Sequence, residues 1–197
     1  MSTGEAYICR MADDFICGFR YKGDAEKFYN TLGMRLGKFG LEVAPEKTGI
    51  IKFTRFKKHL GAKFTFLGFE FQWKLSRNGK DYIAKRTSPK KMTKSLKAFS
   101  IWCKENRNNR IQKIVDMVNI KLRGYYNYYG LLSNSKSINT FHRIATEILY
   151  KWLNRRSQRK SFNYKEFREK MRNYRLIKPR ITESPNIQMS IEDFAFA

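Results

Sequence analysis

Apolar positions follow a strand-like spacing in the first part of the chain and a helical spacing in the second. Residues 8–19 contain two short apolar runs separated by Ala12-Asp13-Asp14. This pattern predicts a β-hairpin with both aspartates at or beside its tip. Residues 24–39 then repeat apolar side chains every three or four positions, which predicts a helix that ends before Gly40.

More strands are expected after this helix. Residues 49–53 are apolar enough for a strand, and residues 55–63 resemble a basic loop. Residues 64–73 carry aromatic side chains at close intervals, and Gly68 inside that run suggests a bulge or a close approach by another group. The Asn78-Gly79 pair predicts a turn, with a partner strand over residues 82–84.

Beyond residue 87 the spacing becomes helical. Ser88-Pro89 has the residue types of an N-cap followed by the first helical position. Four helices are expected, over about residues 89–106, 110–129, 137–154 and 164–174. The fold class is therefore predicted to be α+β, with an α+β part over residues 1–87, an all-helical part over 88–180 and an acidic tail over 181–197.

Charge strengthens this division. The 197 residues carry a formal net charge of +24, and residues 85–180 hold 26 of the 41 lysines and arginines. So much positive charge repels itself unless a polyanion lies against it, and nucleic acid is the usual polyanion. A membrane surface is the weaker alternative, because the basic helices also carry many apolar residues suited to a core.

Other classes of protein are disfavoured by the sequence. No apolar run approaches the ~20 residues of a membrane span, and the first residues have no features of a signal peptide. Three cysteines, Cys9, Cys17 and Cys103, are widely spaced and match no metal-binding pattern. Reduced thiols in a cytoplasmic protein are the expectation.

The adjacent aspartates are the main candidates for chemistry in the first part. Two neighbouring carboxylates repel each other, so a folded protein keeps both ionised mainly when cations share the site. Mg²⁺ suits such a pair, because it takes oxygen ligands from one or two carboxylates together with substrate phosphates. The alternative is an exposed turn, in which Asp is common.

Several short motifs, taken in order, resemble group II intron reverse transcriptases. Met11-Ala12-Asp13-Asp14 is similar to the Tyr-x-Asp-Asp active-site hairpin of reverse transcriptases, with Met11 in place of the usual aromatic residue. Pro45-Glu46-Lys47-Thr48 resembles the following block, and Phe66-Leu67-Gly68-Phe69 resembles the primer-grip hairpin. Leu122–Tyr129 and Tyr150–Arg156 are similar to blocks of the thumb, or maturase domain.

The resemblance implies roles for particular residues. It implies that Asp13 and Asp14 hold catalytic Mg²⁺, that Lys47 protonates or neutralises the leaving pyrophosphate, and that Phe66, Leu67 and Gly68 support the primer end of an RNA/DNA primer-template. For Lys47, the alternative is a solvated lysine in a turn. For Phe66, Leu67 and Gly68, the alternative is an ordinary hydrophobic hairpin. The family also has fingers and a further aspartate upstream of this hairpin, so polymerisation by this chain alone is not expected.

The helical part has its own candidates for binding structured intron RNA. Lysine and arginine give affinity for phosphates, and exposed aromatic rings can stack on unpaired bases. Of four tyrosines within residues 125–129, one or two should face solvent or RNA. The candidate residues are Lys90, Lys91, Lys94, Arg123, Tyr125, Tyr126, Arg155, Arg156, Arg159 and Lys160. For the arginines, a solvated helix end is the alternative.

Two functions remain open from the sequence. The first is the C-terminal palm and thumb of a group II intron reverse transcriptase, active only with its N-terminal part. The second is a non-catalytic RNA-binding module that helps intron RNA to fold. Retron-like and diversity-generating reverse transcriptases share the Asp-Asp hairpin, but the thumb motifs favour the group II type.

Overall fold

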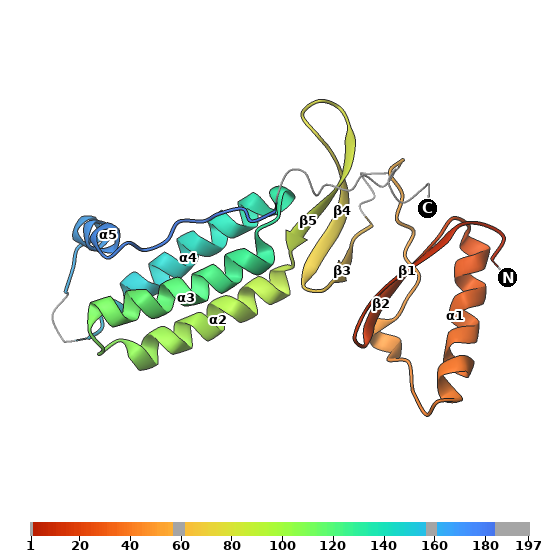
Figure 1. The fold of residues 1–197 in the computed structure, drawn as a ribbon, viewed down its shortest axis with the longest axis horizontal. Coiled ribbons are helices and arrows are strands. Elements are labelled where there is room, and N and C mark those ends of the chain that lie inside the picture. The colour runs from red at the N-terminus through yellow and green to blue at the C-terminus, as the bar shows by residue number, and fades with distance from the viewer. Residues whose placement is uncertain (1, 57–61, 157–160, 184–197) are drawn as a thin grey trace. The chain divides into compact units, whose positions relative to one another are not determined.

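The computed structural model describes residues 2–56, 62–156 and 161–183 of the chain (Figure 1). These residues form two compact units, Met1–Ile83 and Ala84–Ala197. The first unit contains two small antiparallel sheets and one long helix, and the second is dominated by helices. The α+β class predicted from the sequence is confirmed.

The first unit begins with a β-hairpin backed by a helix. Strands β1 (Ala6–Met11) and β2 (Asp14–Phe19) are antiparallel, with Met11 opposite Asp14 across a two-residue turn. Helix α1 (Lys22–Gly37) follows, and the Phe28 ring lies 5.3 Å from the ring of Phe19 on β2. The predicted hairpin and helix are therefore both present.

Polar contacts at the chain start hold the first turn of α1. Asp24 on α1 is buried, and its carboxylate accepts hydrogen bonds from Ser2 Oγ, from Thr3 N and Oγ1, and from Gly4 N. Burial alone would raise the pKa of Asp24, but these hydrogen bonds together bring it below its usual value.

The middle of the chain departs from expectation at one predicted strand and agrees with it at a predicted hairpin. Residues 49–53 belong to no strand, although Phe53 packs its ring 5.0 Å from Phe64. Residues 64–73 form β3 (Phe64–Phe66) and β4 (Phe69–Leu75), so Gly68 lies in a hairpin turn, as the likeness to the primer-grip hairpin implied, and not in a bulge. Leu67 and Gly68 both have positive φ, 50° and 80°, as a tight two-residue hairpin turn requires. A short 3-10 turn, η1 (Pro45–Lys47), occupies the Pro-Glu-Lys stretch.

Strand β5 (Asp81–Thr87) completes the second sheet, whose order is β3-β4-β5. The turn before it contains Gly79, whose φ of 72° explains the glycine. β5 begins in the first unit and ends in the second, where it leads directly into the first helix of the bundle.

The second unit is a bundle of three long helices with a short fourth. Its helices are α2 (Pro89–Asn106), α3 (Ile111–Tyr129), α4 (Ser135–Leu153) and α5 (Tyr164–Asn173), with a 3-10 turn η3 (Leu132–Asn134) between α3 and α4. All four predicted helices are present within one or two residues of their expected ends. The Ser88 side chain accepts a hydrogen bond from Lys91 N, which makes it the predicted N-cap.

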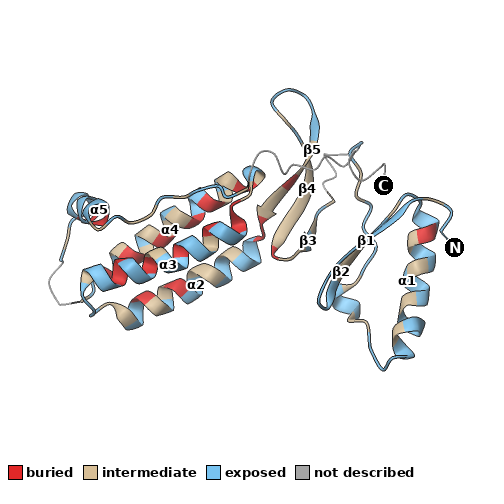
Figure 2. Ribbon diagram, in the orientation of Figure 1, coloured by how far each residue is buried: buried red, intermediate tan, exposed pale blue. Residues whose placement is uncertain are grey.

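The two units differ sharply in burial (Figure 2). The second has a continuous apolar core of side chains from α2, α3, α4 and α5, which includes Phe99, Val115, Leu122, Phe141, Leu149 and Phe167. Among the described residues of the first unit only Asp24 and Gly68 are buried, and no apolar side chain is. The hydrophobic stabilisation of the described structure is therefore concentrated in the helical unit.

Candidate nucleic-acid interface

Helix α2 directs its lysines away from the core. Phe99 and Cys103 on its inner face are buried, whereas Lys90, Lys91 and Lys94 are exposed. The first turn of α2 contains no acidic residue. Positive charge is unfavourable at a helix N-terminus, so this arrangement costs stability in the free protein and suits an anionic partner.

The tyrosines of α3 divide between core and surface. Tyr126 is completely buried and Tyr129 nearly so, while Tyr125 is half-buried and stacks on Phe141 with a ring centroid distance of 3.6 Å. Tyr128 is 54% exposed, and Arg123 is exposed on the same helix. The prediction that Tyr126 contacts RNA is therefore wrong, because no base can reach a ring with no exposed surface. Tyr128 is the tyrosine that can.

Tyr126 instead belongs to a buried polar pair. Its hydroxyl lies 2.7 Å from Nδ1 of His142 on α4, and it donates to that nitrogen when the imidazole carries its proton on Nε2. Burial lowers the pKa of His142, which favours this neutral form. His142 therefore has a structural role in the helical unit. The other histidine, His59, lies outside the described residues.

The two arginines after α4 have different surroundings. Arg155 is exposed, with its guanidinium 5.6 Å from the centre of the Trp152 ring. Arg156 is half-buried and donates from Nε to the carbonyl oxygen of Arg107 and from Nη2 to that of Asn109. Arg156 therefore joins the end of α4 to the α2–α3 loop, while Arg155 is available for a ligand. Arg159 and Lys160 lie outside the described residues.

An extended segment after α5, residues 175–183, lies along α3, and we call it the strap. Asn119 on α3 donates to the carbonyl oxygen of Arg175 (3.1 Å) and accepts from Ile177 N (3.0 Å). Thr182 N and Glu183 N both donate to the carbonyl oxygen of Gly130, at 2.8 and 3.0 Å. Residues 181–183, which the sequence assigned to an acidic tail, are thus part of the helical unit.

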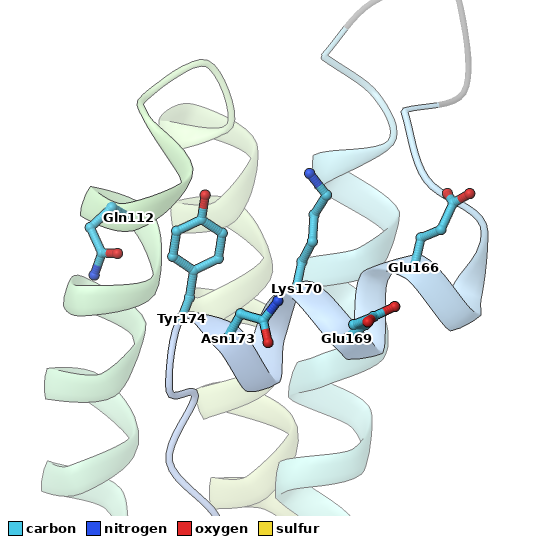
Figure 3. Close-up of a pocket in the computed structure, with 6 residues that line it drawn as sticks. All are labelled: Gln112, Glu166, Glu169, Lys170, Asn173 and Tyr174. Carbon is cyan, nitrogen blue, oxygen red and sulfur yellow. The ribbon is translucent and has the colours of Figure 1, made fainter.

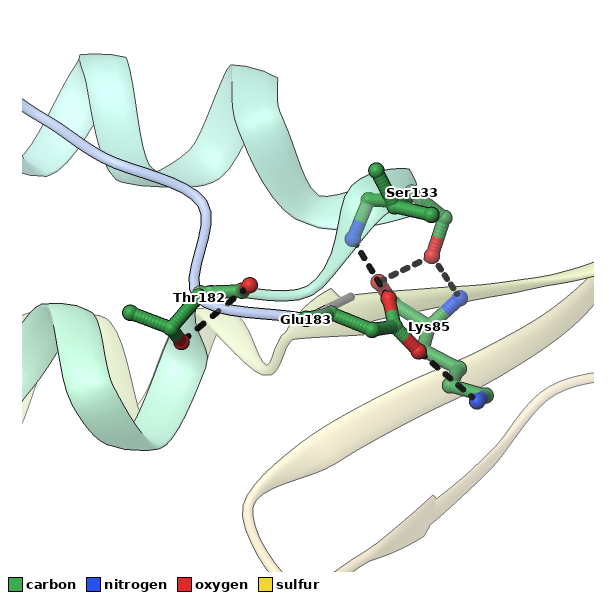
Figure 4. Close-up of polar contacts among 6 residues, drawn as sticks. Lys85, Ser133, Thr182 and Glu183 are labelled. Atoms are coloured by element: carbon green, nitrogen blue, oxygen red, sulfur yellow. Dashed lines mark hydrogen bonds and ion pairs between the residues drawn. The ribbon is translucent and has the colours of Figure 1, made fainter. Parts of the chain in front are cut away.

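The end of the strap is fixed by charge and hydrogen bonds (Figure 4). Glu183 Oε2 accepts from Leu132 N at 2.6 Å, and Glu183 Oε1 lies 3.8 Å from Nζ of Lys85 on β5. Ser133 Oγ accepts from Lys85 N and donates to the Lys85 carbonyl oxygen, each at 3.0 Å. Sequence reasoning missed this junction, because its partners are far apart in the sequence.

Asn134 is a second residue that the sequence did not reveal. Its side chain is fully buried, accepts from Thr87 N (2.8 Å) and donates to Thr87 Oγ1 (2.8 Å) and to the Tyr129 carbonyl oxygen (2.9 Å). Asn134 therefore joins the end of β5 to the end of α3. An asparagine before a helix looks like an ordinary cap in a sequence, so nothing there signals this role.

A pocket of about 560 Å³ lies beside α5 (Figure 3). Its lining is Gln112, Glu166, Glu169, Lys170, Asn173 and Tyr174. Glu166 already accepts from Asn163 N in the capping box of α5. Two carboxylates against one ammonium make the pocket unfavourable for phosphate, so we do not include it in the interface.

The first unit places its predicted site residues at or beside turns, of which those at Asp13, Asp14 and Lys47 are exposed. Asp13 lies in the β1–β2 turn, Asp14 begins β2, and both are exposed, as is Lys47 at the end of η1. Phe66, Leu67 and Gly68 form the end of β3 and its tight turn. The described part of the chain contains no group of three or more His, Cys, Asp or Glu residues that could hold a metal ion. Asp13 and Asp14 alone do not make up a two-cation site.

The fold and the charge together define a basic helical domain with a closed apolar core and cations directed to solvent. Comparison with protein families gives this class a name. Residues 90–174 match the family model described as "Group II intron, maturase-specific domain". Residues 90–174, the larger part of the helical unit, are therefore similar to the maturase-specific domain of group II introns, and the resemblance noted from the sequence is confirmed for that part.

The match supports an intron maturase function. It begins at Lys90, so it does not include the first unit. A search of curated proteins gave no match. Among the described residues, no helix is both long enough and apolar enough to cross a membrane.

Proposed function

We propose that this protein binds the folded RNA of a group II intron through its helical unit and assists the folding of that RNA. The observation that carries the proposal is the match of residues 90–174 to the maturase-specific domain. The geometry adds support, because a closed core leaves the lysines of α2 and Arg123 and Tyr128 of α3 at the surface. Lysines and arginines would bind phosphates, and Tyr128 would stack on an unpaired base.

The α2 lysines provide the test of this proposal. We expect the triple variant Lys90→Gln, Lys91→Gln, Lys94→Gln to bind a group II intron transcript at least tenfold more weakly than the unmodified chain. Loss of several phosphate contacts has an effect of this size at moderate salt. The readout is the Kd from filter binding, with circular dichroism to show that α2 remains folded.

A matched control carries Lys165→Gln, Arg168→Gln and Arg172→Gln on α5. These residues are exposed beside the acidic pocket, so the control removes the same charge from another surface. Equal losses of affinity in the two triple variants would contradict the assignment of α2 to the interface. Failure of the unmodified chain to bind the transcript would contradict the proposed function itself.

A second candidate function belongs to the first unit. We propose that it is the C-terminal part of a reverse-transcriptase palm, in which Asp13 and Asp14 hold Mg²⁺ together with a third carboxylate from a preceding segment. Two observations favour this: the exposed Asp-Asp turn, and the uncovered apolar residues of β1, where Ile8 is 68% exposed. In addition, β1 is an edge strand of the two-stranded sheet that the structure describes, and such an open edge is where a further strand would pair.

Primer extension tests this second function. The full chain, mixed with a separately expressed fingers and palm segment from a group II intron reverse transcriptase, should extend a DNA primer on an RNA template only when Mg²⁺ is present. Asp13→Asn should abolish extension, while Asp81→Asn in the second sheet should not. Extension that survives Asp13→Asn would falsify the assignment of Asp13 as a metal ligand.

A further inference from the structure

Three cations surround one aromatic ring at the end of the helical bundle. The ring of Trp152 on α4 has Lys151 Nζ at 5.6 Å, the Arg155 guanidinium at 5.6 Å and the Arg107 guanidinium at 5.9 Å from its centre. The indole N–H donates to Ser100 Oγ on α2 at 3.1 Å, which fixes the orientation of the ring. We call these four residues, Arg107, Lys151, Trp152 and Arg155, the Trp152 cluster.

The surroundings of the Trp152 cluster are held in place by other contacts. Arg156 donates to the carbonyl oxygens of Arg107 and Asn109, so it fixes the α2–α3 loop against the end of α4. Arg107 is held further by the hydrogen bond from its Nη1 to the Lys104 carbonyl oxygen at 3.1 Å. The cluster is therefore a preorganised arrangement and not a set of independent surface side chains.

The charge of the cluster is not balanced within the described protein. No ion pair joins Arg107, Lys151 or Arg155 to an acidic group among residues 2–56, 62–156 and 161–183. In addition, Nε of Arg107 is buried and has no acceptor in that part of the chain. Like charges around one ring repel each other, and cation–π contacts at exposed sites are weak, so they do not offset this repulsion.

The C-termini of α2 and α4 offer partial compensation, because their carbonyl groups attract positive charge. The guanidinium groups of Arg156 and Arg107 both donate hydrogen bonds to backbone carbonyl oxygens, so their charge is partly compensated in this way. Lys151 and Arg155 make no such bond in the described structure, and both are exposed. Their positions are therefore explained better by an external anion than by the helix ends.

We propose that the Trp152 cluster binds one backbone phosphate of RNA, with Lys151, Arg155 and Arg107 as the charged contacts and Trp152 as the surface that orients them. Arginine suits this task because its planar guanidinium presents two parallel donors to phosphate oxygens. The proposal rests on the proposed RNA-binding function and adds a second point of contact, at the opposite end of α2 from Lys90, Lys91 and Lys94.

The test compares two double variants of the full chain, using a 20-nucleotide single-stranded RNA as the probe. Lys151→Gln with Arg155→Gln removes two cations of the Trp152 cluster, and Lys165→Gln with Arg168→Gln removes two exposed cations of α5. Kd is measured across a series of KCl concentrations. We expect the cluster variant to bind at least fivefold more weakly than the control, and its slope of log Kd against log salt to fall by about 1, as for loss of a phosphate contact.

Equal affinities and equal salt slopes for the two double variants would overturn the phosphate site and leave the proposed function intact. Absence of binding by the unmodified chain would overturn the proposed function instead. Lys151→Arg with Arg155→Lys serves as a further variant, which keeps the charge and should retain most of the affinity. Each variant is first checked for an unchanged melting temperature.

Discussion

At the scale of single residues, neighbouring side chains of the same type have different roles. Tyr126 is completely buried and paired with His142, while Tyr128 two positions later is 54% exposed. Arg156 bonds to carbonyl oxygens of the α2–α3 loop, while Arg155 is exposed beside Trp152. Residue type and helical spacing cannot make these distinctions, because each depends on which side of the helix the neighbouring element covers.

The Tyr126–His142 pair predicts a pH dependence of stability. Burial places the pKa of folded His142 below its usual value of 6.5, so the unfolded chain binds a proton more readily than the folded one. The pair's contribution is therefore complete above pH 6.5 and decreases as the pH falls through 6.5 toward the folded pKa. We expect the melting temperature of the helical unit to fall over this range, because this group lowers the free energy of unfolding by at most about 1.4 kcal/mol per pH unit.

His142→Gln provides the comparison, because glutamine can still accept a hydrogen bond from the Tyr126 hydroxyl but does not titrate. The variant should show a flatter dependence of melting temperature on pH between 7.5 and 5.5. Identical profiles for the variant and the unmodified chain would show that His142 is not the group responsible.

At the scale of elements, local patterns predicted most of the structure. The apolar spacing and the Ser88-Pro89 cap located all four helices of the second unit, because those helices bury the same apolar residues that reveal them. The pattern was less informative over residues 49–73. There the isolated apolar run at 49–53 has no strand partner in the described structure, and positive φ at Leu67 cannot be read from residue type.

The strap was not predicted, because it has no periodic pattern and its partners are distant in sequence. It lies beyond residue 174, where the family match ends, yet it bonds to Asn119 and Gly130 on and after α3. We therefore regard residues 175–183 as an integral part of the folded helical unit in this protein.

Gly130 gives a specific test of the strap. A Cβ atom at Gly130 would overlap the Tyr126 carbonyl oxygen and Thr182 Oγ1, so Gly130→Ala should displace the strap and destabilise the protein by about 1–3 kcal/mol. Gly124→Ala on the same helix is the control. A Cβ there meets nothing within 4 Å, so this change should stabilise α3 by about 0.5–1 kcal/mol.

Chemical denaturation followed by circular dichroism measures both changes in the free energy of unfolding. Equal effects of Gly130→Ala and Gly124→Ala would contradict the packing of the strap against Gly130.

At the scale of the whole molecule, charge and burial are both concentrated in the second unit. It contains the apolar core and most of the basic residues, and it includes residues 90–174, which match the maturase-specific domain model. The first unit has an exposed Asp-Asp turn and no buried apolar side chain among its described residues. We infer that RNA binding resides in the second unit. We also infer that polymerase chemistry in the first unit would require a further carboxylate beside Asp13 and Asp14 and a further segment that covers its exposed apolar residues.

The measurement that tests this account most directly is the affinity of the full chain for a group II intron transcript, compared with an unrelated structured RNA of equal length, over a series of KCl concentrations. We predict tighter binding to the intron transcript at every salt concentration, and a steep loss of affinity for both RNAs as salt rises, because phosphate contacts dominate. Equal affinity for the two RNAs, or affinity that does not change with salt, would contradict a maturase that recognises intron RNA through its basic helical unit.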